Sequence, residues 1–124
     1  MNAITKAQNA YRNDAHLVAT DRDTEYNAFA KVTHRLKAAA RKGDDGFRDL
    51  VSALHDNRNL WTILAADVAD RSNPLPKMLR ARIVYLADFT HQYSSKVLTR
   101  KASADALIEI NTAIMRGLRN ERVK

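Results

Sequence analysis

Segment 50–70 (LVSALHDNRNLWTILAADVAD) limits the possible fold most strongly, because it joins the single tryptophan of the chain to a dense apolar pattern. Its stripe residues recur at steps of four and three, which places them on one face of an α-helix. They are Leu50, Leu54, Asn57, Trp61, Leu64 and Val68. We therefore expect 50–70 to be the central helix of a helical domain, with Trp61 in the core and not exposed as a ligand-stacking platform.

Asn57 is the one polar residue of this stripe, and two explanations for it stay open. Either the helix is interrupted, with Asp56 capping a second segment that begins near Asn57, or Asn57 is buried and hydrogen-bonded. Asn111 interrupts a later apolar stripe in the same way. We predict that both amides are buried and bond to one another, since a paired polar contact can fix the register of two helices.

Upstream of the central helix, the sequence predicts a helix, a connector and a second helix. Residues 2–15 carry a thin stripe of Ile4, Ala7 and Tyr11, which packs weakly as a docked terminal helix or serves as an arm that moves when a partner binds. Residues 16–22 show no clear helical period and are predicted to form the connector. Asp23 is the predicted N-cap of a helix that stops at Gly43. Its stripe contains Tyr26, Phe29, Val32 or Thr33, Leu36 and Ala40.

Downstream, segment 71–76 (RSNPLP) is the clearest boundary, because two prolines end the central helix and Pro76 suits the first turn of the next one. The stripe of that next helix contains Leu79, Ile83, Leu86, Thr90, Tyr93 and Val97, and Met78, Tyr85 and Phe89 widen it. So wide an apolar face is expected to contact two neighbouring helices.

Ser103 is the predicted cap of a last helix. One side of it is lined by Leu107, Ile108, Asn111, Ile114, Met115 and Leu118. Gly117 lies inside this pattern, where it permits close packing or marks fraying. At 124 residues the chain has room for one domain, 1–124. The predicted fold is all-α, an antiparallel helical bundle of four main helices plus a short N-terminal helix.

The net charge of +7 is concentrated in the second half of the chain. Through Asp70 there are ten Lys/Arg and ten Asp/Glu, whereas from Arg71 onward there are eleven and four. This asymmetry suggests an acidic partner, either protein or nucleic acid, or else a solvated basic surface.

Motifs for other functions are missing from the sequence. There is no cysteine, the four histidines are scattered, and no phosphate-binding glycine loop or serine nucleophile motif is present. We therefore expect no enzyme, no metal site, no cofactor and no small-molecule substrate. No aromatic strand or GXXG loop offers an RNA-stacking platform. No signal-peptide core or membrane span is evident, so we expect a cytoplasmic protein that contacts no membrane.

Several segments together resemble the FlaF family of bacterial flagellar biosynthesis regulators. The longest is 55–90 (HDNRNLWTILAADVADRSNPLPKMLRARIVYLADFT), followed by 107–119 (LIEINTAIMRGLR). The resemblance reaches back through 25–39 (EYNAFAKVTHRLKAA) and 7–11 (AQNAY), so it covers nearly the whole chain. The connector 16–22 is the part that matches least.

This resemblance implies a cytoplasmic factor needed for flagellin synthesis and export, which binds flagellin as a secretion chaperone and acts in concert with the FlbT regulator. The alternatives are a post-transcriptional regulator that binds flagellin messenger RNA directly, and an adaptor for FlbT. The family pattern carries no catalytic residue. Binding of a helical protein is also what a bundle with an oversized apolar face supports most directly. The candidate partner-binding residues are Ile4, Tyr11, Arg58, Arg80 and Arg116.

Overall fold

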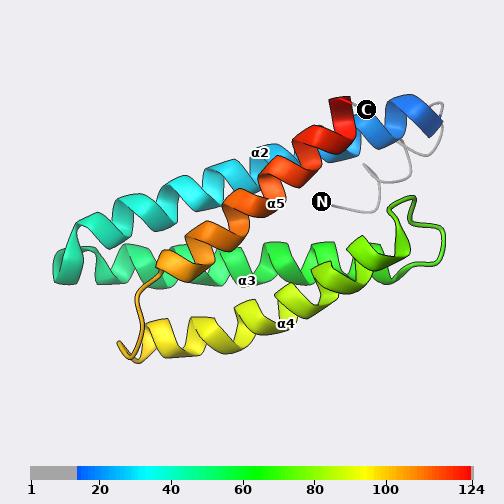
Figure 1. Cartoon of the computed structure of the whole chain (residues 1–124). Coiled ribbons are helices and arrows are strands. Elements are labelled where there is room, and N and C mark those ends of the chain that lie inside the picture. The colour runs from blue at the N-terminus through cyan, green and yellow to red at the C-terminus, as the bar shows by residue number, and fades with distance from the viewer. Residues whose placement is uncertain (1–13, 124) are drawn as a thin grey trace.

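The computed structural model describes the backbone of residues 14–123 and the side chains of residues 23–119. Within this range the chain forms four long α-helices, and each runs antiparallel to the one before it (Figure 1). They are α2 (Asp14–Arg41), α3 (Phe47–Ala69), α4 (Lys77–Leu98) and α5 (Asp105–Val123), with a short 3₁₀ turn, η1 (Gly43–Gly46), between α2 and α3. The predicted antiparallel bundle of four main helices is confirmed. The N-terminal helix predicted at 2–15 lies outside the described residues, apart from its last two positions, which belong to α2.

The connector predicted at 16–22 is wrong, because these residues continue α2 without a break. α2 is a single helix of 28 residues, so Asp23 lies inside it and is not its N-cap. No proline or glycine occurs between Asp14 and Arg41. Without either residue nothing forces the backbone out of the helical conformation, even where the apolar period is weak.

Two glycines make the turn between α2 and α3. Gly43 has a φ of +61°, a left-handed conformation that glycine adopts without steric cost, and the predicted stop at this residue is confirmed. Gly46 is buried, and a Cβ atom there would collide with the backbone oxygen of Ala39. The turn therefore brings the two helices closer together than any larger residue at position 46 would allow.

The helices pack in the order α5, α2, α3, α4. α3 lies between α2 and α4, whereas α5 packs mainly on α2 and meets α4 over only a short stretch. In one buried cluster Phe29 meets the Trp61 ring edge to face, with ring centroids 5.4 Å apart. A second cluster lies nearer the η1 turn and includes Leu36, Leu54 and Leu107. The central position predicted for the tryptophan helix is thus confirmed.

A layer of polar side chains crosses the interior, and every helix contributes to it. Its buried members are Thr33, Asn57, Thr90, Ser94 and Asn111. Asn111 is the hub, because its amide nitrogen donates to Asn57 Oδ1 (2.8 Å) and Thr33 Oγ1 (3.1 Å). Its amide oxygen accepts a hydrogen bond from Trp61 Nε1 at 2.9 Å. The predicted burial and pairing of Asn57 and Asn111 is confirmed, and α3 is continuous through Asn57, which excludes the interrupted helix.

Candidate partner-binding surface

The first half of α4 exposes large apolar side chains on the side that faces away from the bundle. Met78 is 86% exposed, Tyr85 is 67% exposed and Val84 is 45% exposed. Single exposed apolar residues are common on protein surfaces and need no explanation. Three such residues within about two turns of one helix form a continuous surface, which we call the outer α4 face and define as Met78, Ala81, Arg82, Val84 and Tyr85.

The helical period explains why the bundle leaves this face uncovered. The buried residues of α4 follow steps of four and three and point toward α3; they are Ile83, Ala87, Thr90, Ser94 and Val97. Successive residues are rotated by about 100°, so Tyr85 lies about 200° from Ile83 and points outward. The sequence predicts Met78 and Tyr85 on the flank of a face that two neighbours cover. α4 does contact both α3 and α5, but neither helix covers these two side chains.

A shallow depression of about 610 Å³ lies on this face. It is lined by Met78, Leu79, Ala81, Arg82 and Tyr85, all of which belong to α4. The small side chain of Ala81 lies between Met78 and Tyr85 on the helix surface, which leaves room for a side chain from outside. The depression therefore suits a partner segment that lies lengthwise on the surface of α4.

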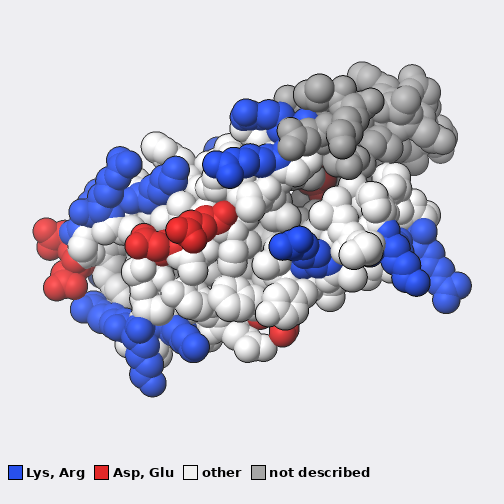
Figure 2. Space-filling model, viewed as in Figure 1, with Lys and Arg blue, Asp and Glu red and all other residues white. Residues whose placement is uncertain are grey.

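Segment 71–87, which contains the outer α4 face, carries only positive charges, whereas the exposed Asp88 lies one turn beyond Val84 and Tyr85. From Arg71 to Ala87 the chain has four Lys/Arg and no Asp or Glu. Arg80 is engaged, since its Nη1 donates to the backbone oxygen of Asp70 at 3.1 Å. Arg71, Lys77 and Arg82 are exposed and form no ion pair with another described residue. In Figure 2, Lys and Arg side chains lie over and beside the first half of α4, with uncharged surface between them.

The candidate residues predicted from sequence do not gather at one site. Arg58 joins α3 to α4, because its Nη2 donates to the backbone oxygen of His91 and to Ser95 Oγ, both at 2.7 Å. Arg80 ties the start of α4 to the end of α3. Arg116 is exposed on α5. Arg58 and Arg80 thus hold helices together, and Ile4 and Tyr11 lie outside the described residues.

In the sequence, Met78 and Tyr85 are residues that widen the apolar face of α4, and Arg82 is not among the candidate site residues. Two signals for this surface were available in the sequence. The apolar face of α4 is wider than a single neighbouring helix covers, and the segment 71–87 lacks acidic residues.

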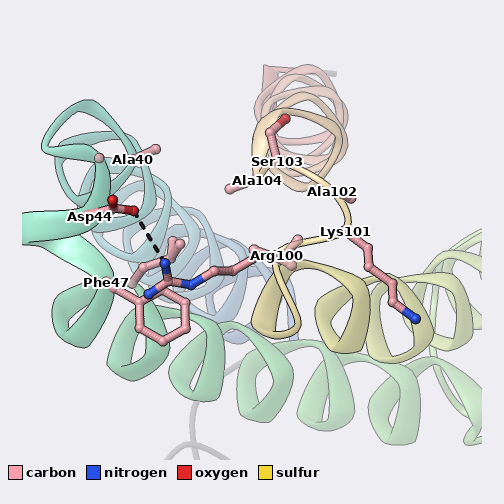
Figure 3. Close-up of a pocket in the computed structure, with 11 residues that line it drawn as sticks. Ala40, Asp44, Phe47, Arg100, Lys101, Ala102, Ser103 and Ala104 are labelled. Atoms are coloured by element: carbon pink, nitrogen blue, oxygen red, sulfur yellow. Dashed lines mark hydrogen bonds and ion pairs between the residues drawn. The ribbon is translucent and has the colours of Figure 1, made fainter.

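A second depression, of about 520 Å³, lies at the end of the bundle where α4 turns into α5 (Figure 3). Arg100 has a φ of +63° there, which is unusual for a residue other than glycine. Its guanidinium lies 4.3 Å from the ring centroid of Phe47 and 3.4 Å from Asp44 Oδ1. These contacts join the α4–α5 turn to η1, so Arg100 serves the architecture of this end.

Ser103 lies on the same turn and acts as predicted. Its Oγ accepts a hydrogen bond from the backbone N–H of Asp105 at 3.3 Å. It thereby satisfies one of the free amide groups at the start of α5.

The described residues contain no group of three or more His, Asp or Glu side chains placed to hold a metal ion. No helix in the described part of the chain is both long and apolar enough to cross a membrane. The features that the described residues do offer are a helical bundle and an outward-facing apolar surface bordered by cations.

A helical bundle with such a face defines a class of small all-α proteins with an apolar surface that a partner can bind. Within this class, the family model described as flagellar protein FlaF matches residues 7–118. The chain therefore belongs to the FlaF family and is a flagellar protein, which confirms the resemblance seen in its sequence. Neither a curated protein nor a solved structure matches the chain.

Proposed function

We propose that this protein is a flagellin-binding secretion chaperone of the bacterial cytoplasm, required for flagellin synthesis and export, which acts in concert with FlbT and has no catalytic activity. The observation that carries this proposal is the exposure of Met78 and Tyr85 on the outer α4 face. Exposed apolar side chains on a small bundle are available to a partner and contribute little to the stability of the free protein.

The chemistry of flagellin supports the same proposal. Monomeric flagellin must be prevented from polymerising before export, and its terminal segments are amphipathic helices. An amphipathic helix lays its apolar side on an apolar helix surface or groove of a partner. The outer α4 face offers such a surface, and the family places the protein in the flagellar system.

The test is a titration of the purified protein with monomeric flagellin at about 50 and about 200 mM salt, in which fluorescence anisotropy measures binding. Binding through apolar contacts is expected to survive the higher salt, because screening weakens exposed charge pairs more than buried apolar contacts. FlbT is added in a second titration to measure whether it joins the complex. Absence of a flagellin complex at both salt concentrations would contradict the proposal.

Direct binding of flagellin messenger RNA is the second candidate, and the acid-free segment from Arg71 to Ala87 is the observation that favours it. Lys and Arg side chains that neutralise phosphates make affinity strongly dependent on salt. A protein that contacts about six to ten phosphates loses roughly 10³ to 10⁵ in affinity between about 50 and 200 mM salt. Titration with the flagellin leader RNA therefore separates the two functions. Tight RNA binding without a flagellin complex would replace the first proposal by the second.

A further inference from the structure

We infer that the outer α4 face binds one amphipathic helix whose apolar stripe is bordered by Asp and Glu side chains. This inference rests on the proposed function, because it describes the chemistry of the segment that the same surface would accept. It adds the conformation of the partner segment and the sign of its charges.

The dimensions of the surface favour a helix as the occupant. Met78 and Tyr85 are seven residues apart, which corresponds to about 10 Å along the axis of α4. An apolar strip that is about two turns long and one side chain wide matches the i, i+3, i+4, i+7 anchors of an amphipathic helix. The backbone amides of α4 are engaged in the helix itself, so an extended segment would find no free edge to pair with.

The position of Ala81 supports close packing of two helices. Ala81 lies between Met78 and Tyr85, one turn from each, and all three line the same depression. A small residue at the centre of an interface lets one side chain of the partner enter between two larger ones. Met78 adds adaptability, because its unbranched side chain can adjust to the shape of different apolar partners.

The charges around the strip select acidic flanks. Arg82 lies beside the apolar residues on the outer α4 face, and Lys77 directly precedes Met78 at the N-terminal end of α4. Asp88, whose Oδ2 accepts a hydrogen bond from Gln92 Nε2 at 3.0 Å, is the first acidic residue along α4 and lies one turn beyond Tyr85. The positive charge is therefore concentrated between Lys77 and Arg82. A helix with basic flanks would meet like charges here, which disfavours the complex, whereas Asp and Glu flanks would meet opposite charges.

A nucleic acid is a poorer match for the same surface. Phosphates would pair with Lys77 and Arg82, and Tyr85 could stack on a base. The exposed aliphatic side chains of Met78 and Val84, however, would gain nothing from a phosphate backbone. The apolar character of the surface therefore favours a protein helix over RNA.

The experiment uses the full-length protein and three synthetic helical peptides with the same apolar stripe and with flanks of Glu, Gln or Lys. At about 50 mM salt we expect the Glu peptide to bind at least about tenfold more tightly than the Lys peptide. Arg82→Glu is expected to reduce or reverse this preference. Lys37→Glu, which makes the same charge change at an exposed position of α2, is the matched control and is expected to retain it.

A second pair of variants tests the apolar strip. Met78→Ser and Tyr85→Ser are each expected to weaken binding of the Glu peptide by roughly tenfold, because both remove an apolar anchor. Ile63→Ser removes a side chain that is 59% exposed on α3, away from the outer α4 face, and is expected to leave binding unchanged. Thermal melts followed by circular dichroism check that every variant keeps the fold.

Titration of the same variants with monomeric flagellin separates this inference from the proposed function. If flagellin binds and Met78→Ser, Tyr85→Ser and Arg82→Glu leave its affinity unchanged, the inference is wrong and the proposed function stands. If flagellin does not bind and the Glu peptide binds with the expected sensitivities, the inference stands and the proposed partner is wrong. Equal binding of all three peptides overturns the inference, as does leader RNA binding that depends on Arg82 and not on Met78.

Discussion

The interior of the bundle and the outer α4 face reverse the usual distribution of side chains. In the interior, Asn57 and Asn111 are completely buried and bonded to one another. On the outer α4 face, Met78 and Tyr85 are largely exposed and lie among cations. Burying an amide costs free energy unless it is hydrogen-bonded, whereas exposing an apolar side chain forgoes a gain.

The two regions differ in whether the chain itself supplies hydrogen-bond partners for the polar groups and cover for the apolar side chains. The polar layer finds most of its partners within the chain, because Asn111 alone reaches Trp61, Asn57 and Thr33. The outer α4 face finds no covering helix among the described residues. The first region therefore specifies how α2, α3 and α5 align, and the second remains available for another molecule. Stability measurements should therefore respond strongly to changes in the first region and weakly to changes in the second.

The largest expected effect is that of Trp61→Ala. This change removes the Phe29 contact and leaves Asn111 Oδ1 without its donor in a buried site. We expect a loss of about 3 to 5 kcal/mol in the free energy of unfolding, enough to abolish a cooperative thermal transition. Circular dichroism during a thermal melt measures this. A variant that melts within a few degrees of the parent would show that Trp61 does not stabilise the interior of the bundle.

The next effect separates the two asparagines. Asn111→Leu leaves the donor of Trp61 and the acceptors of Asn57 and Thr33 unpaired, and we expect it to cost about 2 to 3 kcal/mol. Asn57→Leu leaves Asn111 still bonded to Thr33 and removes an amide nitrogen, Asn57 Nδ2, that has no partner in the described structure. It should cost about 1 kcal/mol. Urea titrations give both values, and equal losses would contradict the role of Asn111 as the hub.

Arg58→Ala tests a residue that joins α3 to α4, the helix that carries the outer α4 face. The change removes two hydrogen bonds from α3 to α4, so we expect a loss of about 1 to 2 kcal/mol in the free energy of unfolding. Because Arg58 is engaged within the bundle, flagellin affinity of the folded variant should be unchanged. Arg58→Lys keeps the positive charge and is the control that separates the effect of the charge from that of the guanidinium hydrogen bonds. A fall in affinity at unchanged stability would restore Arg58 as the partner contact that the sequence suggests.

Gly117→Ala is expected to stabilise the protein. Gly117 is exposed on α5, and a Cβ atom there would meet nothing within 4 Å. Alanine in a helix interior is favoured over glycine by about 1 kcal/mol, and a urea titration measures the gain. Gly46→Ala is the contrasting control, because its Cβ would collide with the backbone oxygen of Ala39. Destabilisation by Gly117→Ala would mean that this glycine permits a close contact after all.

The smallest expected effect on stability is that of Met78→Ser and Tyr85→Ser. Both side chains are largely exposed, and surface substitutions away from special features usually change stability by no more than about 0.5 kcal/mol. Thermal melts of the free variants test this. A loss comparable to that of Asn57→Leu would show that the outer α4 face belongs to the core, which would remove the difference between the two regions.

The helical spacing in the sequence was sufficient to predict α3, α4 and α5 and the pairing of Asn57 with Asn111. It was sufficient because steps of three and four identify a buried face wherever apolar residues are frequent. It failed at 16–22, where a weak apolar period coincides with a backbone that nothing interrupts. Continuity of a helix depends on the absence of breaking residues as well as on the presence of an apolar stripe.

The candidate surface was harder to predict than the fold, for a physical reason. Spacing shows which side chains of α4 share a face, but the neighbouring helices decide how much of that face is covered. Met78 and Tyr85 therefore read as core from the sequence, although they are exposed. The spacing also does not show that Arg58 and Arg80 bond within the chain, because their partners come from α4 and from the end of α3.

The position of Asn111 has a consequence for the order of folding. α2, α3 and α4 are successive neighbours that can form hairpins during synthesis, but Asn111 must return across 78 positions of the chain to reach Thr33. Closing such a long loop costs more entropy than forming a hairpin and generally makes folding slower. Trp61 Nε1 finds its acceptor only when α5 docks. α5, which leaves the ribosome after α2, α3 and α4, thus completes the polar layer, and a nascent chain that ends before Asn111 lacks the group that joins α2 to α3.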